Sequence, residues 1–392
     1  MGSRTPRFLI ALAIVAFATP AAAQQTVSDV LSFLLTNRSI PTGDFVQDAT
    51  AAAATRDTIS TFLLVELSTL PVASSASAFT YRLDPTLGMD VRSSDSFGPF
   101  LVERSLTAGR LRGSVALSYQ ALSFRTIDGR SLTDGTLVAT ASRLRGEAQP
   151  FDVEALSLDI HTKTMTILGN LGLTDRLDIG AALPIVTLSL DGRRVDTYRG
   201  TQLVQAIGSA SASGAGDLLI RGKYNLVRRA GSGLAVGGEA RLPTGSDENL
   251  LGTGKTSITP RMIASLERER IAVHGNVGYT RGGLSDEFDY AGAITVVGTP
   301  RLTVVGELGG RRLSSAGRLT DTTAAHPTLV GVDTIRLTSV QRATERVVGL
   351  VGVKWNVAAT MLLSANVMRP LTSAGLNAGW ISTFAFDYSF EH

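Results

Sequence analysis

The chain has 392 residues, 37 Lys and Arg against 34 Asp and Glu, a formal net charge of +3, 40 glycines and no cysteine. The missing cysteines exclude a disulfide framework, a lipid-modified cysteine anchor and thiolate chemistry. The positive charges are spread along the chain and form no basic stripe, so nucleic acid is not an expected partner. No stretch after the first residues approaches the roughly twenty apolar residues of a spanning helix.

The first residues have the pattern of a secretory signal peptide. Arg4 and Arg7 precede an apolar run at 8–17, and three alanines at 21–23 supply the small residues of a cleavage site. The apolar run is about half as long as a spanning helix requires. We therefore expect residues 1–23 to be removed after export, not kept as an anchor.

Residues 24–75 lack strand periodicity. Apolar side chains recur at helical spacing within 26–37, and 48–56 is Ala-rich with an acidic start, so two short helices are expected. The segment is either a periplasmic extension below the rest of the protein or a plug inside it. The residues expected to hold such a plug are Val27, Leu31 and Leu34.

Residues 76–392 alternate between apolar and polar side chains, which is the period of a strand with two unlike faces. About fourteen strands fit the pattern, and twelve to sixteen remain possible, since closed single-chain barrels of this kind have even strand numbers. The expected strands are 77–86, 97–106, 111–126, 153–173, 176–190, 214–228, 233–243, 255–267, 270–281, 287–298, 301–313, 344–354, 358–369 and 376–390.

The connections between these strands are sorted by length. Short turns, such as 174–176 and 267–270, alternate with long polar connections, mainly 127–150, 191–213 and 314–343. Bacterial outer-membrane barrels have short periplasmic turns and longer external loops. The sequence thus predicts an all-β fold, a closed antiparallel transmembrane β-barrel in the bacterial outer membrane. Its expected partners are the lipid of that membrane, the barrel assembly machinery and a small solute.

The polar faces of the strands give the candidate functional residues. A Lys or Arg facing lipid at the bilayer midplane costs about 2 to 4 kcal/mol, so charges are expected on the lumen side. They either fill the lumen as structural ion pairs or set the path of a solute, and the two roles are compatible. The lumen-lining candidates are Asp159, His161, Lys163, Arg221, Lys223, Glu239, Arg241, His274 and Glu307.

No catalytic, cofactor-binding or metal-binding residue is predicted. The stretch LLGTGKT at 250–256 ends like a phosphate-binding loop, but Asn249 stands where its first glycine belongs. The four histidines lack metal-ligand spacing. We therefore do not expect an enzyme.

Several passages resemble the outer-membrane β-barrel family named after the meta pathway of phenol degradation. They lie at 168–186, 214–226, 233–265 and 273–280. The resemblance implies a transporter for small, hydrophobic or aromatic molecules. The layout is also similar to that of fatty-acid and toluene channels, which implies a plug at 24–75. A structural or adhesive barrel, and an enzyme barrel such as a lipase, are the alternatives.

Overall fold

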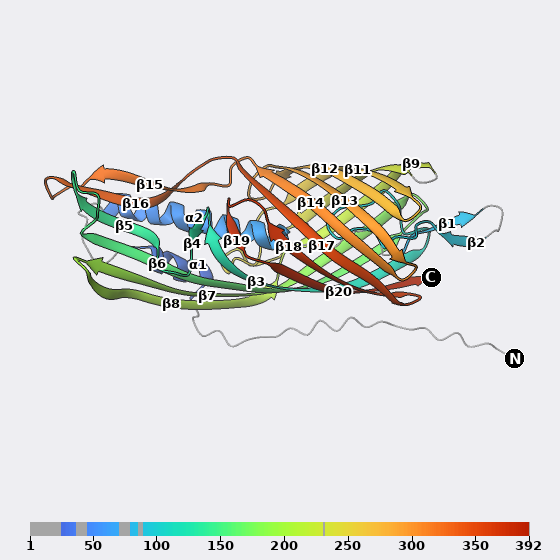
Figure 1. The fold of residues 1–392 in the computed structure, drawn as a ribbon, viewed down its shortest axis with the longest axis horizontal. Coiled ribbons are helices and arrows are strands. Elements are labelled where there is room, and N and C mark those ends of the chain that lie inside the picture. The colour runs from blue at the N-terminus through green and yellow to red at the C-terminus, as the bar shows by residue number, and fades with distance from the viewer. Residues whose placement is uncertain (1–24, 37–44, 70–78, 85–88, 230–231, 392) are drawn as a thin grey trace.

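The computed structural model describes residues 25–36, 45–69, 79–84, 89–229 and 232–391, so the expected signal peptide at 1–23 lies outside it. Twelve strands pair antiparallel into a closed ring (Figure 1). They are β3 (Arg112–Ile127), β6 (Asp152–Gly172), β7 (Leu177–Tyr198), β9 (Leu218–Arg229), β10 (Ser232–Leu242), β11 (Ser257–Arg268), β12 (Ile271–Gly282), β13 (Glu287–Thr299), β14 (Leu302–Leu313), β17 (Thr344–Ala358), β18 (Met361–Pro370) and β20 (Ile381–Glu391). The ring closes between β20 and β3, where Phe384 is paired with Tyr119.

The predicted closed barrel is confirmed, with a strand number at the lower end of the expected range. Two of the expected strands, 77–86 and 97–106, are not part of the ring. Within the first, β1 (Tyr81–Asp84) pairs with β2 (Met89–Arg92) in a separate two-stranded sheet. Four residues are too few to cross a bilayer, which needs about nine to eleven. Residues 97–106 form no strand. They run irregularly inside the barrel, where side chains of the wall bind their backbone.

Six further strands extend the wall beyond one end of the ring. They are β4 (Arg130–Ser131), β5 (Leu137–Leu144), β8 (Thr201–Ala215), β15 (Arg318–Ala325), β16 (Val332–Val340) and β19 (Leu376–Ala378). Most of them lie in the connections expected to be long loops, and we call this part of the wall the outer extension. Because the long connections gather at this end, we assign it to the cell exterior and the short-turn end to the periplasm.

Two helices lie along the outer extension (Figure 1). The first, α1 (Val27–Leu35), begins at a capping box in which Thr26 and Asp29 bind each other's backbone N–H. The second, α2 (Phe45–Thr69), is longer than the short helix expected at 48–56, because no Pro or Gly interrupts the chain up to Thr69. Neither of these described helices is apolar enough over its length to cross a membrane.

Helix α1 sits on β7 and β8 where two glycines allow close approach. A Cβ atom at Gly192 would lie 2.2 Å from Cδ1 of Leu34, and one at Gly208 would lie 3.0 Å from Cγ1 of Val30. The guanidinium of Arg194 on β7 donates to the carbonyl of Leu34 at 3.2 Å, which satisfies an end carbonyl of the helix. The helix is therefore fixed to the outer extension by both packing and hydrogen bonds.

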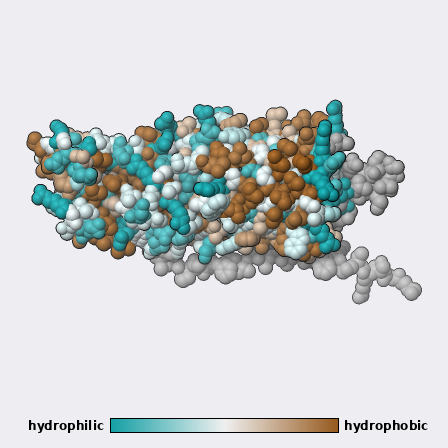
Figure 2. Space-filling model, in the orientation of Figure 1, coloured by the Kyte–Doolittle hydropathy of each residue, from teal (hydrophilic) through white to brown (hydrophobic). Residues whose placement is uncertain are grey.

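The outer surface of the ring is apolar. Side chains such as Leu117, Ile294 and Val351 are exposed there, and Figure 2 shows hydrophobic residues gathered over this part of the molecule. Exposed aromatic residues stand near the strand ends, with Trp355 at the short-turn end and Trp380 at the other. An apolar band flanked by aromatic residues is the lipid-facing surface of an outer-membrane barrel.

Candidate functional site

Residues 97–108, which we call the lumen loop, lie inside the barrel toward its periplasmic end. The first half of the loop is bound by two strands. The carboxylate of Glu307 on β14 accepts the backbone N–H groups of Phe100, Leu101 and Val102, the last two at 2.8 and 3.1 Å. Lys354 on β17 donates to the carbonyl of Pro99 at 2.7 Å. Irregular backbone at membrane depth is tolerated because protein groups satisfy it in this way.

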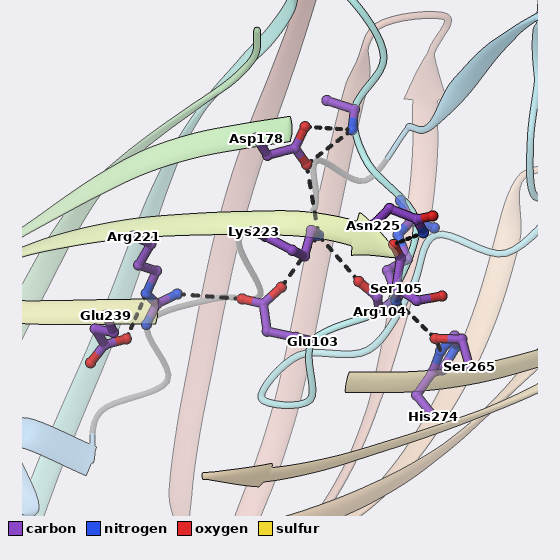
Figure 3. A network of polar contacts seen from close by, with 11 residues as sticks. Glu103, Arg104, Ser105, Asp178, Arg221, Lys223, Asn225, Glu239, Ser265 and His274 are labelled. Atoms are coloured by element: carbon purple, nitrogen blue, oxygen red, sulfur yellow. Dashed lines mark hydrogen bonds and ion pairs between the residues drawn. The ribbon is translucent and has the colours of Figure 1, made fainter. Parts of the chain in front are cut away.

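The second half of the lumen loop is held on the opposite side of the ring (Figure 3). Lys223 Nζ donates to the carbonyl of Arg104 at 3.1 Å, and Asn225 donates to that of Ser105 at 2.6 Å. The N–H of Ala108 donates to both carboxylate oxygens of Asp178, at 3.1 and 3.2 Å. Polar wall side chains thus replace the strand pairing that the sequence pattern had suggested.

A chain of ion pairs joins the lumen loop to the wall (Figure 3). Arg221 Nε lies 2.7 Å from Glu239 on the neighbouring strand β10, and its Nη1 lies 3.7 Å from Glu103 of the loop. Lys223 lies 3.7 Å from Glu103 and 3.7 Å from Asp178. Arg221 therefore contacts one carboxylate of the wall and one of the loop.

Above the lumen loop is a cavity of about 210 Å³, which we call the chamber. Leu101 of the loop lies at its floor, and Val65 and Glu66 of α2 border it on the outer side. One wall is charged, and its ionic residues are Arg221, Glu239, Arg241, Arg261, Glu287, Asp289 and Arg311. The facing wall is mostly apolar, with Leu122, Val348, Met368 and Ile381 beside Gln120 and Arg346. The chamber is thus amphipathic.

The charges of the chamber are largely paired. Arg261 lies 3.2 Å from Asp289, and Arg311 binds both carboxylate oxygens of Glu287 at 2.6 Å. Arg346 of β17 pairs with Glu66 of α2, which ties the lower part of the helix to the ring. Such pairs stabilise a buried arrangement only when both partners are present.

Six of the nine predicted lumen residues point into the barrel. Arg221, Glu239 and Arg241 line the chamber. Lys223, His274 and Glu307 are buried below it, where His274 Nδ1 lies 2.9 Å from the hydroxyl of Ser265. Ser265 in turn accepts the N–H of Ser105. Three candidates therefore line the chamber, and three position the lumen loop.

Asp159, His161 and Lys163 were expected in the lumen, but the structure places them on the outer face of β6. The side chains of Asp159 and His161 are 57% and 44% exposed, whereas Leu158 and Ile160 between them are buried. Apolar residues of this stretch point inward because the helices, not lipid, provide their apolar surroundings. The rule that the apolar face meets lipid fails wherever the barrel holds an apolar core.

On this outer face His161 bridges two side chains. Its Nδ1 lies 2.7 Å from the hydroxyl of Ser123, and its Nε2 lies 2.9 Å from Asp159. A serine hydrolase has the opposite order, with the serine at Nε2 and the carboxylate at Nδ1. The cross-strand pairing of Ser123 with His161 is sufficient to explain the contact.

The predicted plug residues Val27, Leu31 and Leu34 are at most 2% exposed. They pack in the outer extension, beyond the ring, and the lumen loop occupies the ring itself. Within the described residues no group of three or more His, Asp or Glu side chains is placed to hold a metal ion.

Sequence reasoning missed several lumen charges, among them Glu103, Asp178, Arg261, Arg311 and Lys354. For Arg261 and Arg311 the signal was present, because each lies on the polar face of an expected strand. Glu103 was missed since 97–106 was interpreted as a strand of the wall.

A second cavity, of about 490 Å³, lies on the periplasmic side of the lumen loop. Ser105 and Leu106 of the loop border it, together with Asp175, Arg228 and Glu267. The loop therefore lies between this cavity, which we call the mouth, and the chamber.

Comparison with known proteins gives one family match. Solved structures that match the chain include an outer-membrane channel from Pseudomonas putida F1, at 15% identity and a TM-score of 0.46, covering 71% of this chain and 96% of that one. The translocator domain of the autotransporter NalP from Neisseria meningitidis matches at 9% identity and a TM-score of 0.36, covering 72% and 89%. No curated protein matches the chain. Residues 148–316 match the family described as "Putative MetA-pathway of phenol degradation", which is the family that the sequence resembled.

Proposed function

We propose that the protein is an outer-membrane channel for small organic molecules. The observation that carries the proposal is the place of the lumen loop, which lies between two cavities inside a closed ring and is held there by hydrogen bonds, ion pairs and the packing of Phe97 and Phe100. A chamber lined by charged side chains also suits a polar path through the barrel. A loop held without covalent bonds can move aside and join the cavities.

The route follows from the lining residues. The chamber reaches Thr253 and Gly282 to Ser285, which lie at the outer rim of β11, β12 and β13. A solute would enter there, occupy the chamber, pass the lumen loop and leave through the mouth. The lumen loop is therefore the principal barrier on this route.

The chamber also limits the solute. An apolar cavity of about 150 Å³ binds benzene, so about 210 Å³ suits a molecule of one ring with a small polar group. The apolar wall would face the ring, and the charged wall would face the polar group. This size and this lining favour small aromatic or branched compounds over sugars of several units.

Planar-bilayer recording tests the proposal. Arg241→Leu removes a cation that lines the chamber, so the reversal potential in a salt gradient should shift toward cation selectivity. Lys163→Leu is the matched control, because it removes a cation from the outer face of the barrel. Equal selectivity of the wild type and of both variants would argue that the chamber is not on the conducting route, as would a wild-type barrel that does not conduct.

A further inference from the structure

The guanidinium of Arg221 is shared between the wall and the lumen loop. Its contact with Glu239 is 2.7 Å, whereas its contact with Glu103 is 3.7 Å, so the bond to the loop is the longer of the two. Arg221 also lines the chamber, with 13% of its side chain exposed. A group that enters the chamber can therefore reach the same side chain that holds the loop.

The space beside this contact fits one small polar group. A pocket of about 20 Å³ is bordered by Glu103 and by Arg221, Glu239 and Arg261, which also line the chamber. A water molecule needs at least about 10 to 15 Å³ of such space. Gly237 borders the same pocket, and the missing side chain leaves this room on β10. One carboxylate oxygen or one water molecule can occupy the pocket beside Arg221.

The side chains that line the chamber carry one more positive than negative charge. The lining contains five arginines, Arg221, Arg241, Arg261, Arg311 and Arg346. It contains four carboxylates, Glu66, Glu239, Glu287 and Asp289. Glu103, 4% exposed, supplies the fifth carboxylate from the lumen loop. A single negative charge on a solute would thus take the electrostatic place of Glu103.

We propose, on the basis of the channel function above, that the chamber binds small organic monocarboxylates at Arg221 in competition with Glu103, and that binding loosens the lumen loop. Arginine suits this exchange, because its planar group binds carboxylates in a bidentate manner. The apolar wall of Leu122, Val348 and Met368 would take the hydrocarbon part of the solute. The solute shifts the loop because it binds well only when Glu103 has left Arg221.

The competition predicts that one variant gains affinity for the solute. Glu103→Gln removes the internal competitor, so it should bind the probe benzoate more tightly than the wild type does. Coupling between sites is typically about five- to 150-fold, and we expect a gain within that range. Arg221→Gln should lose benzoate binding, and Arg221→Lys, which keeps the charge without the planar group, should fall between. The neutral analogue benzamide should bind to all of these proteins with the same affinity.

The experiment uses the full-length barrel in detergent and measures benzoate binding by calorimetry, without any conduction. Gel mobility before and after heating shows that each variant is folded. The loop is followed through Ser105→Cys, which introduces the only thiol of the chain at the border of the mouth. Benzoate should speed the reaction of this thiol with a soluble reagent, and this effect should vanish in the Arg221→Gln background.

Two results would overturn the inference. If Glu103→Gln binds benzoate no more tightly than the wild type, there is no competition. If folded Arg221→Lys and Arg221→Gln bind it as the wild type does, the site is elsewhere. Glu269→Gln, in an exposed turn, is the control for loss of a carboxylate. Failure of conduction with intact benzoate binding would reject the channel and leave this site standing.

Discussion

Glu307 on β14 accepts a hydrogen bond of 2.8 Å from the backbone N–H of Leu101, 206 residues earlier in the chain. The same carboxylate also accepts the N–H groups of Phe100 and Val102. Three successive donors of an irregular segment therefore depend on one side chain. On the β14 side, Glu307 therefore holds the lumen loop through three hydrogen bonds.

Replacement of Glu307 should release the lumen loop without unfolding the barrel. Glu307→Leu leaves three N–H groups without their acceptor, two of them buried, and each buried unsatisfied group costs about 1 to 3 kcal/mol. Glu307→Gln keeps one acceptor oxygen and should have a smaller effect. We expect larger and more frequent conductance steps in the order wild type, Gln, Leu. Glu147→Gln, exposed in the outer extension, should behave as the wild type. An unchanged Leu variant would mean that the loop does not block the path.

The ion pair between Glu66 and Arg346 should hold α2 to the ring. Both side chains are buried, and removing one partner of such a pair typically costs about 3 to 5 kcal/mol. Glu66→Leu and Arg346→Leu should each lower the unfolding temperature of the protein and increase hydrogen exchange in α2.

The double variant Glu66→Leu/Arg346→Leu distinguishes this ion pair from two independent contributions. If the residues act as a pair, the double variant should be more stable than the Arg346→Leu single variant, because it leaves no lone buried carboxylate. Arg346 also donates to the carbonyl of Leu376 at 2.9 Å, so it has a contact that is independent of Glu66. If the losses of stability in the two single variants add up to the loss in the double variant, the two residues act separately.

A charge on the outer face of the ring should hinder membrane insertion. Ile294 lies in the middle of β13 and is 53% exposed. Arginine facing lipid near the bilayer midplane costs about 2 to 4 kcal/mol, so Ile294→Arg should reduce the folded fraction in lipid vesicles, measured by gel mobility without heating. Val330→Arg is the control, because Val330 is fully exposed in the outer extension. Equal losses in both variants would contradict the lipid-facing position of Ile294.

The ring could be predicted because it obeys a simple local rule. Each of its twelve strands coincides with an expected strand to within a few residues, apart from β7, which continues to Tyr198. Residues such as Leu234 and Arg241 alternate because one side meets lipid and the other a polar lumen. A pattern of period two reports that contrast directly.

The lumen loop and the outer extension could not be predicted from the same rule. Residues 97–106 are apolar and polar in an order that fits a strand, but Glu307, Lys223 and Lys354 take their backbone bonds from positions far away in the chain. Hydrogen bonds between a backbone segment and distant side chains produce no periodic pattern in the sequence of that segment. In β6 the inner face changes from Leu158 to Thr162 where the apolar helix packing gives way to the polar lumen, and hydropathy alone then assigns His161 to the wrong side.

The close approach of α1 to the wall leads to the last prediction. Gly192→Val would place side-chain atoms where Leu34 now lies, because even a Cβ atom would be 2.2 Å from its Cδ1. Overpacking of this kind typically costs about 1 to 3 kcal/mol. We therefore expect α1 to detach from β7 while the ring stays closed. Hydrogen exchange should rise at Val30 to Leu35 and stay unchanged in β12. Gly169→Val is the matched control, since a Cβ atom at Gly169 meets nothing within 4 Å. If α1 also limits entry to the chamber, the Gly192 variant alone should admit benzoate faster. If hydrogen exchange in α1 is the same in the Gly192 variant and in the control, Leu34 can change its rotamer to make room and α1 stays packed on β7.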